Sequence, residues 1–268
     1  MMVLMPLCPK DPEKLPIRAA LVLALGLGLP APSQAGWEGL YGGIHAARGS
    51  HDFATGYDHS RFGTCTNLNF GSEWPGEGCE GNQDYTTAQR GRAAARAVGL
   101  SLERLYERGG RVLGWQVNLE RAAEAGTEFS QVLSTTWGDR LDVAVATRGS
   151  VDVRFVFGLP RDIWLPYVSV GAGLERVAIS FTQDQIGYDV PATGSTEDWT
   201  QRLVLGVGVK RDLGQGWVLG TELNVSRSGP AHLAAEGGLY SYGLRYPDTD
   251  IDSTIEATSL RIGLSRRF

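Results

Sequence analysis

Residues 112–121 read VLGWQVNLER, and they alternate between two kinds of side chain. Leu113, Trp115, Val117 and Leu119 fall in one phase, while glycine, glutamine, asparagine and glutamate fall in the other. A period of two is that of a β-strand whose two faces meet unlike surroundings. The stretch therefore predicts a strand with one apolar and one polar neighbourhood.

The same alternation recurs along the chain. It predicts eight strands, at about 39–48, 93–105, 112–122, 140–157, 164–181, 199–211, 217–227 and 254–268. Long and short connections alternate between them, so all the tight turns lie at one end. This pattern predicts an all-β fold: an eight-stranded antiparallel up-and-down transmembrane β-barrel with long extracellular loops and short periplasmic turns. Closure pairs the last strand with the first, so neither is an open edge.

A lipocalin is the main soluble alternative, because its strands alternate as well. The glycines favour the membrane barrel, since Gly114, Gly206, Gly208 and Gly220 all share the phase of the charged residues. The lumen of an eight-stranded barrel is just wide enough for side chains to fill, so large polar residues need small neighbours there. The polar phase is therefore expected to face the lumen and the apolar phase to face lipid.

Aromatic residues gather at the predicted strand ends. Trp115, Trp164 and Trp217 lie near the short turns, and Phe181 and Trp199 lie near the long loops. Tryptophan and tyrosine are enriched at the two membrane interfaces of such barrels. We interpret these residues as interfacial aromatics, with scattered core aromatics as the alternative.

The N-terminal residues have the features of an export signal. Basic residues precede an apolar run at 19–29, and Ser33-Gln34-Ala35 has the form of a cleavage site. We expect a cleaved signal peptide at 1–35 and a barrel domain at 36–268, located in the cell outer membrane. No later stretch is apolar for 18 residues, which excludes transmembrane helices. The net charge of −5 disfavours nucleic acid as a partner.

Two cysteines remain after the predicted cleavage. Cys65 and Cys79 bracket a segment without strand or helix periodicity. In an exported protein such a pair is predicted to form a disulfide bond. A metal site or a reactive thiol is the alternative, although further ligands at finger-like spacing are missing.

Charged residues also occur in the predicted lumen phase. Unpaired buried charges are costly, so these residues are expected to form ion pairs. They form either a plug that fills the lumen or a polar path for small solutes, and the narrow bore favours the plug. The predicted lumen charge network comprises Glu103, Glu120, Arg154, Arg202, Glu222 and Arg261, and Asp152 and Glu175 share the same phase.

The four histidines raise the possibility of a lipid-active hydrolase. Such an enzyme needs a nucleophile and an orienting acid close to the histidine. No serine stands at a recognisable spacing from any of the four histidines. His45 is expected in a strand, and the other three are expected in loops: His51, His59 and His232. We predict no catalytic, metal-binding or cofactor-binding residues, and no cofactor.

Four segments resemble the opacity-type, or OmpA-like, outer membrane β-barrel proteins of Gram-negative bacteria. They are WEGLYGGI at 37–44, LPYVSVGAGLE at 165–175, GWVLGTELNV at 216–225 and SLRIGLSRRF at 259–268. The resemblance implies insertion by the barrel assembly machinery, with Leu264 and Phe268 in the assembly signal. It implies outer membrane lipid as a partner, but no shared activity, because members are structural, adhesive or weakly pore-forming.

Together these features predict a non-enzymatic outer membrane protein. It would act as a structural protein or surface antigen, recognising a host or environmental surface ligand through its extracellular loops. A narrow porin-like channel for small solutes is the first alternative, and a lipid-active outer membrane hydrolase is the second.

Overall fold

The computed structural model describes residues 36–60, 84–132, 140–184, 192–235 and 249–268. This part of the chain holds no helix that could span a membrane. Its strands are β1 (Gly39–Ser60), β2 (Asp84–Arg108), β3 (Arg111–Glu124), β4 (Gly126–Val132), β5 (Arg140–Gly158), β6 (Trp164–Asp184), β7 (Ala192–Gly214), β8 (Trp217–Ala235) and β9 (Thr249–Arg267).

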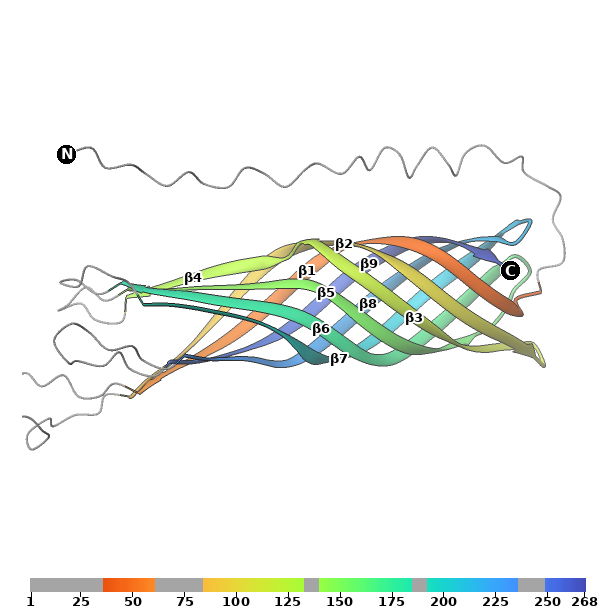
Figure 1. The fold of residues 1–268 in the computed structure, drawn as a ribbon. Coiled ribbons are helices and arrows are strands. Elements are labelled where there is room, and N and C mark those ends of the chain that lie inside the picture. Colours follow the sequence, from red (N-terminus) through yellow and green to blue (C-terminus); the bar gives the residue numbers. More distant parts are fainter. Residues whose placement is uncertain (1–35, 61–83, 133–139, 185–191, 236–248) are drawn as a thin grey trace, which may run out of the picture. The chain divides into compact units, whose positions relative to one another are not determined.

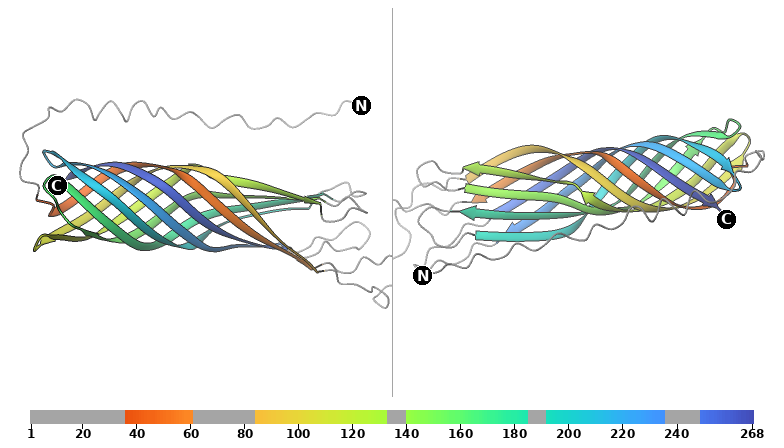
Figure 2. Two further views of the ribbon diagram at one scale, coloured as in Figure 1. Left: turned by 180° about the vertical axis from the view of Figure 1, so that it is seen from behind. Right: turned by 90° about the horizontal axis from the view of Figure 1, so that it is seen from above.

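The strands form one antiparallel sheet that closes on itself (Figures 1 and 2). β1 pairs with both β2 and β9, and β5 pairs with β6 and with the consecutive strands β3 and β4. Only Ala125 separates β3 from β4, so the two together occupy one strand position of the barrel. We call each such position a stave, and the ring has eight staves. The predicted eight-stranded up-and-down barrel, and the pairing of its first and last strands, are confirmed.

Tight turns lie at one end of the barrel. Two residues join β2 to β3, and two join β7 to β8. Gly109 and Gly110 have φ values of 58° and 69°, while Gln215 and Gly216 have values of 52° and 79°. Positive φ at both central residues matches the twist of a two-residue hairpin. β1 starts and β9 ends at this same end, where Tyr41 lies opposite Arg267.

At the other end most strands are longer than the sequence predicted, although β5 starts at Arg140 as expected. β1 was expected to end near residue 48 and continues to Ser60; β8 was expected to end near residue 227 and continues to Ala235. The prediction failed there because the outward residues become polar beyond these points, so the membrane pattern stops although the strand does not. We call this part of the barrel the loop-end extension.

The outer wall carries an apolar belt next to the short turns. Large apolar side chains are exposed there on every stave; examples are Leu100 on β2, Phe155 on β5, Leu205 on β7 and Ile262 on β9. Phe155, for example, is 72% exposed. Soluble proteins rarely expose a continuous apolar surface of this extent to water. The predicted assignment of the apolar phase to the outside is confirmed in this belt.

The interior has three layers, whereas the sequence predicted a polar lumen throughout. An apolar cluster fills the short-turn end, comprising Trp37, Tyr41, Leu105, Val112, Val156, Leu165, Tyr167 and Val218. Charged and polar side chains occupy the middle. A larger apolar cluster fills the loop-end extension, comprising Phe53, Tyr57, Leu141, Val143, Val145, Val177, Ile179, Phe181, Ala231, Leu233, Ile251 and Ile255.

Candidate functional site

The middle layer is built around Arg154, whose side chain is fully buried. Its Nε lies 2.6 Å from Asp152 Oδ1, and its Nη1 lies 3.3 Å from Glu222 Oε2. Asn118 donates to Asp152 Oδ1 at 2.8 Å, and Ser169 donates to Glu222 Oε1 at 2.7 Å. One carboxylate from the same strand and one from β8, across the ring, thus meet one guanidinium, and neutral donors satisfy them further.

A second set of contacts surrounds Glu120. Arg261 Nη2 lies 2.6 Å from Glu120 Oε1, and its Nη1 reaches Glu222 at 3.3 Å. His45 Nε2 lies 3.0 Å from the same Glu120 oxygen. Arg202 is 3.9 Å from the other oxygen of Glu120. Arg261 therefore joins the two halves of the network across the lumen.

Glu103, the last predicted member, pairs with Lys210 nearer the short turns. The structure therefore brings all six predicted lumen charges inside the barrel. Sequence reasoning missed Lys210 and His45 as members. The sequence contained the evidence for Lys210, because this residue shares the inward phase of Gly206 and Gly208 on β7. A methyl group at Gly206 would meet Glu222 Oε1 and Ser169 Oγ at 2.4 Å, so the buried carboxylate needs this glycine.

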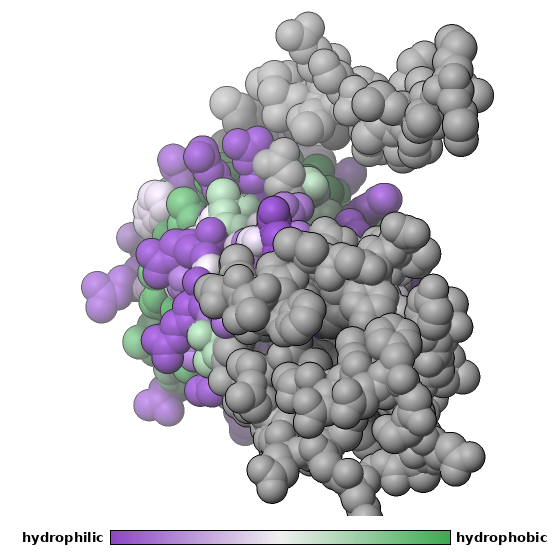
Figure 3. All heavy atoms as spheres, turned by 90° about the vertical axis from the view of Figure 1, so that its left-hand side faces the viewer, coloured by the Kyte–Doolittle hydropathy of each residue, from purple (hydrophilic) through white to green (hydrophobic). Residues whose placement is uncertain are grey.

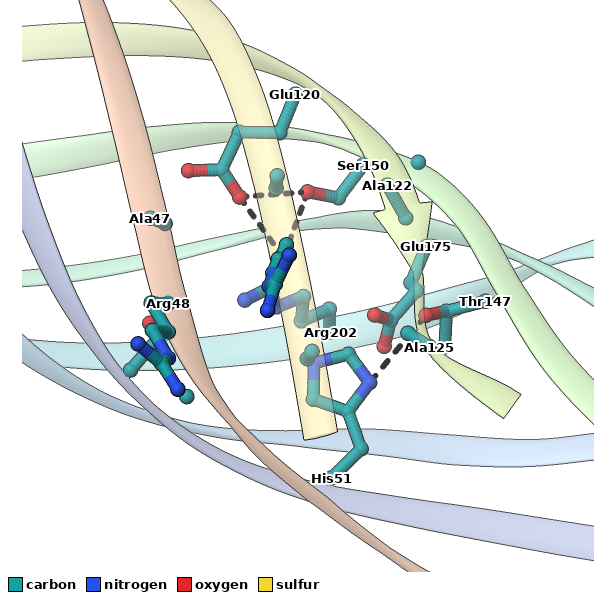
Figure 4. Close-up of a pocket in the computed structure, with 16 residues that line it drawn as sticks. Ala47, Arg48, His51, Glu120, Ala122, Ala125, Thr147, Ser150, Glu175 and Arg202 are labelled. Carbon is teal, nitrogen blue, oxygen red and sulfur yellow. Dashed lines mark hydrogen bonds and ion pairs between the residues drawn. The ribbon is translucent and has the colours of Figure 1, made fainter. Parts of the chain in front are cut away.

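Two small cavities interrupt the polar layer. One, shown in Figure 4, lies at its loop-end side, where Arg202, Ser150, His51 and Glu175 converge. The other lies beside Lys210. Each has a volume of about 40 Å³, which is room for a few water molecules at most. Neither cavity is large enough to form a solute path.

Apolar side chains close both ends of this layer. Trp37 and Leu165 are at most 2% exposed at the short-turn end, and Phe53 and Ile251 are at most 1% exposed in the loop-end extension. Desolvating an ion between such groups is expensive. The described residues thus form a sealed polar core, and their geometry is that of a plug.

The aromatic residues predicted at the interfaces fall into two groups. Trp164 and Trp217 face outward at the short-turn edge of the belt, with arginine guanidiniums 5.2 and 5.6 Å from their ring centroids. Trp115 is partly exposed on the same wall. Trp199 is exposed at the far edge. Phe181 was placed wrongly: it is 5% exposed and packs inside the loop-end extension.

Other predicted residues lie as follows. His51, His59 and His232, expected in loops, lie in β1 and β8, because these strands extend beyond the membrane pattern. Leu264 and Phe268 share the outward phase of β9, and Phe268 is 81% exposed while its N–H donates to the carbonyl of Leu40 at 2.9 Å. Residues 1–35, Cys65 and Cys79 lie outside the described residues.

The belt has the height of a bilayer core. On β6 residues 165–175 separate Trp164 from Arg176, and on β8 residues 218–226 separate Trp217 from Arg227. A tilted strand crosses the hydrocarbon in about 9–11 residues. A closed barrel with an apolar exterior, a charged interior and interfacial aromatics is the architecture of a barrel that spans the outer membrane. The chain is an outer membrane β-barrel.

Comparisons with known proteins find similarities among solved structures alone. No protein-family model matches the chain, and no curated protein matches it either. Among solved structures, it is similar to Neisserial surface protein A (11% identity, covering 83% of this chain and 99% of that chain, TM-score 0.34). It is also similar to Ail, the attachment invasion locus protein of Yersinia pestis (12%, 84% and 99%, TM-score 0.26), and to the outer membrane protein AlkL (16%, 91% and 97%, TM-score 0.28).

These three are small outer membrane β-barrel proteins, the type that the sequence resembles. Identities and TM-scores this low assign no activity or ligand to this chain.

Proposed function

We propose that this outer membrane β-barrel is a non-enzymatic surface protein that holds recognition loops clear of the lipid. The observation that carries the proposal is the loop-end extension. β1 continues for twelve residues beyond Arg48, at the edge of the apolar belt, and it is packed there around the apolar cluster that contains Phe53 and Ile251. A barrel serving only to cross the bilayer would need none of this length.

The extension has the makeup of a water-exposed barrel. Its outward residues include the ion pairs Arg92–Asp52 and Arg140–Asp142, whose side chains are 40–72% exposed. Its interior is packed with the larger apolar cluster. Such a wall is a rigid support, and binding residues commonly sit on loops that a rigid scaffold positions.

The sealed interior argues against transport. The six predicted lumen charges are ion-paired, the cavities have volumes of about 40 Å³ each, and apolar clusters close both ends. His45 is 6% exposed and lies within this interior, where no lipid substrate reaches it. A role in recognition or adhesion is therefore preferred to a narrow channel or a lipid hydrolase.

The proposal includes the export and maturation steps. Residues 1–35 are a cleavable signal peptide, Cys65 and Cys79 form a disulfide, and Leu264 and Phe268 belong to the signal read by the assembly machinery. Mass spectrometry of the protein from outer membranes should show Gly36 as the first residue and a linked Cys65–Cys79 peptide. An uncleaved N-terminus or two free thiols would contradict these points separately.

Attachment of cells tests the recognition role. Cells that display the protein should adhere to cultured epithelial monolayers or to abiotic surfaces better than cells with the vector alone. Replacing residues 61–83 by a short glycine–serine linker should remove the gain, whereas replacing residues 185–191 should change it less. Each variant must still migrate as a heat-modifiable barrel. Equal adhesion by all cells, or unitary conductance in planar bilayers, would refute the proposal.

A further inference from the structure

Arginines encircle the barrel at the loop-side edge of the apolar belt. On six staves the first charged outward residue beyond the last large apolar side chain is an arginine, and all six are exposed: Arg48, Arg96, Arg121, Arg148, Arg176 and Arg227. On β2, for example, Arg96 follows Val98, and on β6 Arg176 follows Leu174. These guanidiniums stand at the level where lipid headgroups replace lipid tails.

Two sides of this ring differ. On one side the arginines have carboxylate partners: Arg176 lies 3.0 Å from Glu197, and Arg227 lies 3.7 Å from Glu256. On the other side four consecutive staves, β1, β2, β3 and β5, carry an arginine arc made up of Arg48, Arg96, Arg121 and Arg148.

The arc brings like charges together. Arg48 lies directly opposite Arg96 in the β1–β2 register. Arg121 is paired with Gly149 on β5, and Arg148 stands beside that glycine at a β-bulge. Like charges directly opposite each other destabilise a sheet. Among the described residues, Arg48, Arg121 and Arg148 have no ion pair, although Arg96 makes a further contact within the protein.

The position of the arc indicates which kind of anion would neutralise its arginines. Guanidinium groups bind phosphate through paired N–H donors, and arginine is the residue of choice for this recognition. A ligand at this level must also have apolar chains that lie along the belt below, where Leu100, Leu119 and Val151 follow Arg96, Arg121 and Arg148 along their strands. Hydrophilic side chains project from the visible rim of the wall when the barrel is seen from the loop end (Figure 3).

We infer that the arginine arc binds the phosphate groups of phosphorylated lipids in the leaflet on the loop side. On the paired side of the barrel Glu197 and Glu256 neutralise Arg176 and Arg227, so that side does not attract them. The barrel therefore has one lipid-binding face, on β1, β2, β3 and β5. This inference rests on the placement of the belt in the bilayer and not on the recognition role of the loops.

Two matched variants each remove three positive charges. The arc variant carries Arg48→Gln, Arg121→Gln and Arg148→Gln. The control carries Arg90→Gln, Arg176→Gln and Arg227→Gln, which removes three exposed outward arginines that lie off the arc or already have carboxylate partners. Both are refolded into zwitterionic vesicles that contain one part in ten of diphosphorylated lipid A, or of the same lipid without its phosphates.

Native mass spectrometry after detergent extraction counts the lipids that remain bound. The parent should retain the phosphorylated lipid and not the dephosphorylated one. Because each arginine near an anionic surface contributes about 1 kcal/mol, the arc variant should lose roughly a hundredfold in retention. The control should stay close to the parent. A failure of the cell-adhesion test would leave this result unchanged.

Three outcomes would overturn the inference. They are equal retention by the arc and control variants, equal retention of the two lipids, and complete displacement of the lipid by millimolar inorganic phosphate, which would assign the arc to a soluble anion. If the arc variant does not fold, as judged by heat-modifiable migration, the three single substitutions carry the same comparison against Arg176→Gln.

Discussion

The belt and the loop-end extension use one strand pattern in opposite surroundings. In the belt, β1 points Ile44 outward and His45 inward; in the extension it points Asp52 outward and Phe53 inward. The phase of β1 is the same in both. Only the solvent outside the wall has changed, from lipid to water, and the interior has changed with it.

The border between the two parts is marked in the backbone. Register shifts occur between Arg96 and Ala97, between Thr147 and Gly149, and between Ser228 and Ala231, all close to the arginine ring. A β-bulge re-aims the side chains beyond it and increases the local twist. The strand register thus changes where the wall leaves the bilayer. Mutations in the belt and mutations in the loop-end extension should therefore have different effects.

The largest effect is expected inside the belt. Arg154→Met should destabilise the barrel by about 3–5 kcal/mol, because it leaves the buried Asp152 without its ionic partner and Glu222 with Arg261 alone. Arg176→Met, in the exposed pair with Glu197, should cost no more than about 1 kcal/mol. Urea unfolding in lipid vesicles measures both free energies. Similar values for the two would show that the lumen is hydrated and not sealed.

In the extension the apolar interior should be the sensitive element. Ile179 is 1% exposed there, so Ile179→Ala should cost about 2–5 kcal/mol in the free energy of unfolding. Val170→Ala on the same strand faces outward in the belt, where lipid tails fill the space left by the methyl groups, and should cost much less. If the alanine at position 179 is harmless, the extension is not a packed core.

The outward face should respond in the reverse order. Val207→Arg, in the belt, should cost about 2–4 kcal/mol if that position lies at the bilayer midplane. Ser180→Arg faces outward in the extension and should stay within about 0.5 kcal/mol of the parent. Folding titrations into vesicles report both. Equal penalties would move the membrane boundary further towards the loops.

Sequence alone predicted the belt because lipid imposes a strict local pattern. Leu203, Leu205, Val207 and Val209 alternate with lumen residues, and no partner strand is needed to read them. On β1 and β2 the extension was missed because its outward residues, such as Asp52 and Arg92, have the composition of a loop. On β5 the strand predicted at 140–157 already covers the extension, because Leu141, Val143 and Val145 alternate there with polar or small residues.

The lumen network was predictable in membership but not in pairing. Arg154, Glu222 and Arg261 could each be assigned to the inward phase from their own strands. Their contacts join residues 68 and 39 positions apart, and depend on which staves face each other across the ring. Shear and strand tilt fix those neighbours, and both depend on bulges that the alternation does not reveal.

The smallest expected effect is a pH dependence confined to the extension. Burial lowers the pKa of His51, and Arg202 lowers it further against the opposing effect of Glu175. The folded barrel therefore keeps this histidine neutral, with its Nδ1 3.3 Å from Thr147 Oγ1. An unfolded chain protonates it below about pH 6.5, so its contribution is intact above that pH and is lost as the pH falls towards the lowered value. Between pH 7.5 and pH 5 the parent should lose on the order of 1 kcal/mol more than His51→Gln, which cannot be protonated. Urea midpoints of the two proteins at both pH values give this difference, and the carboxylates that titrate in both cancel from it. An identical loss in the two would show that His51 is solvated, and that the cavity which it shares with Arg202 and Glu175 opens to water.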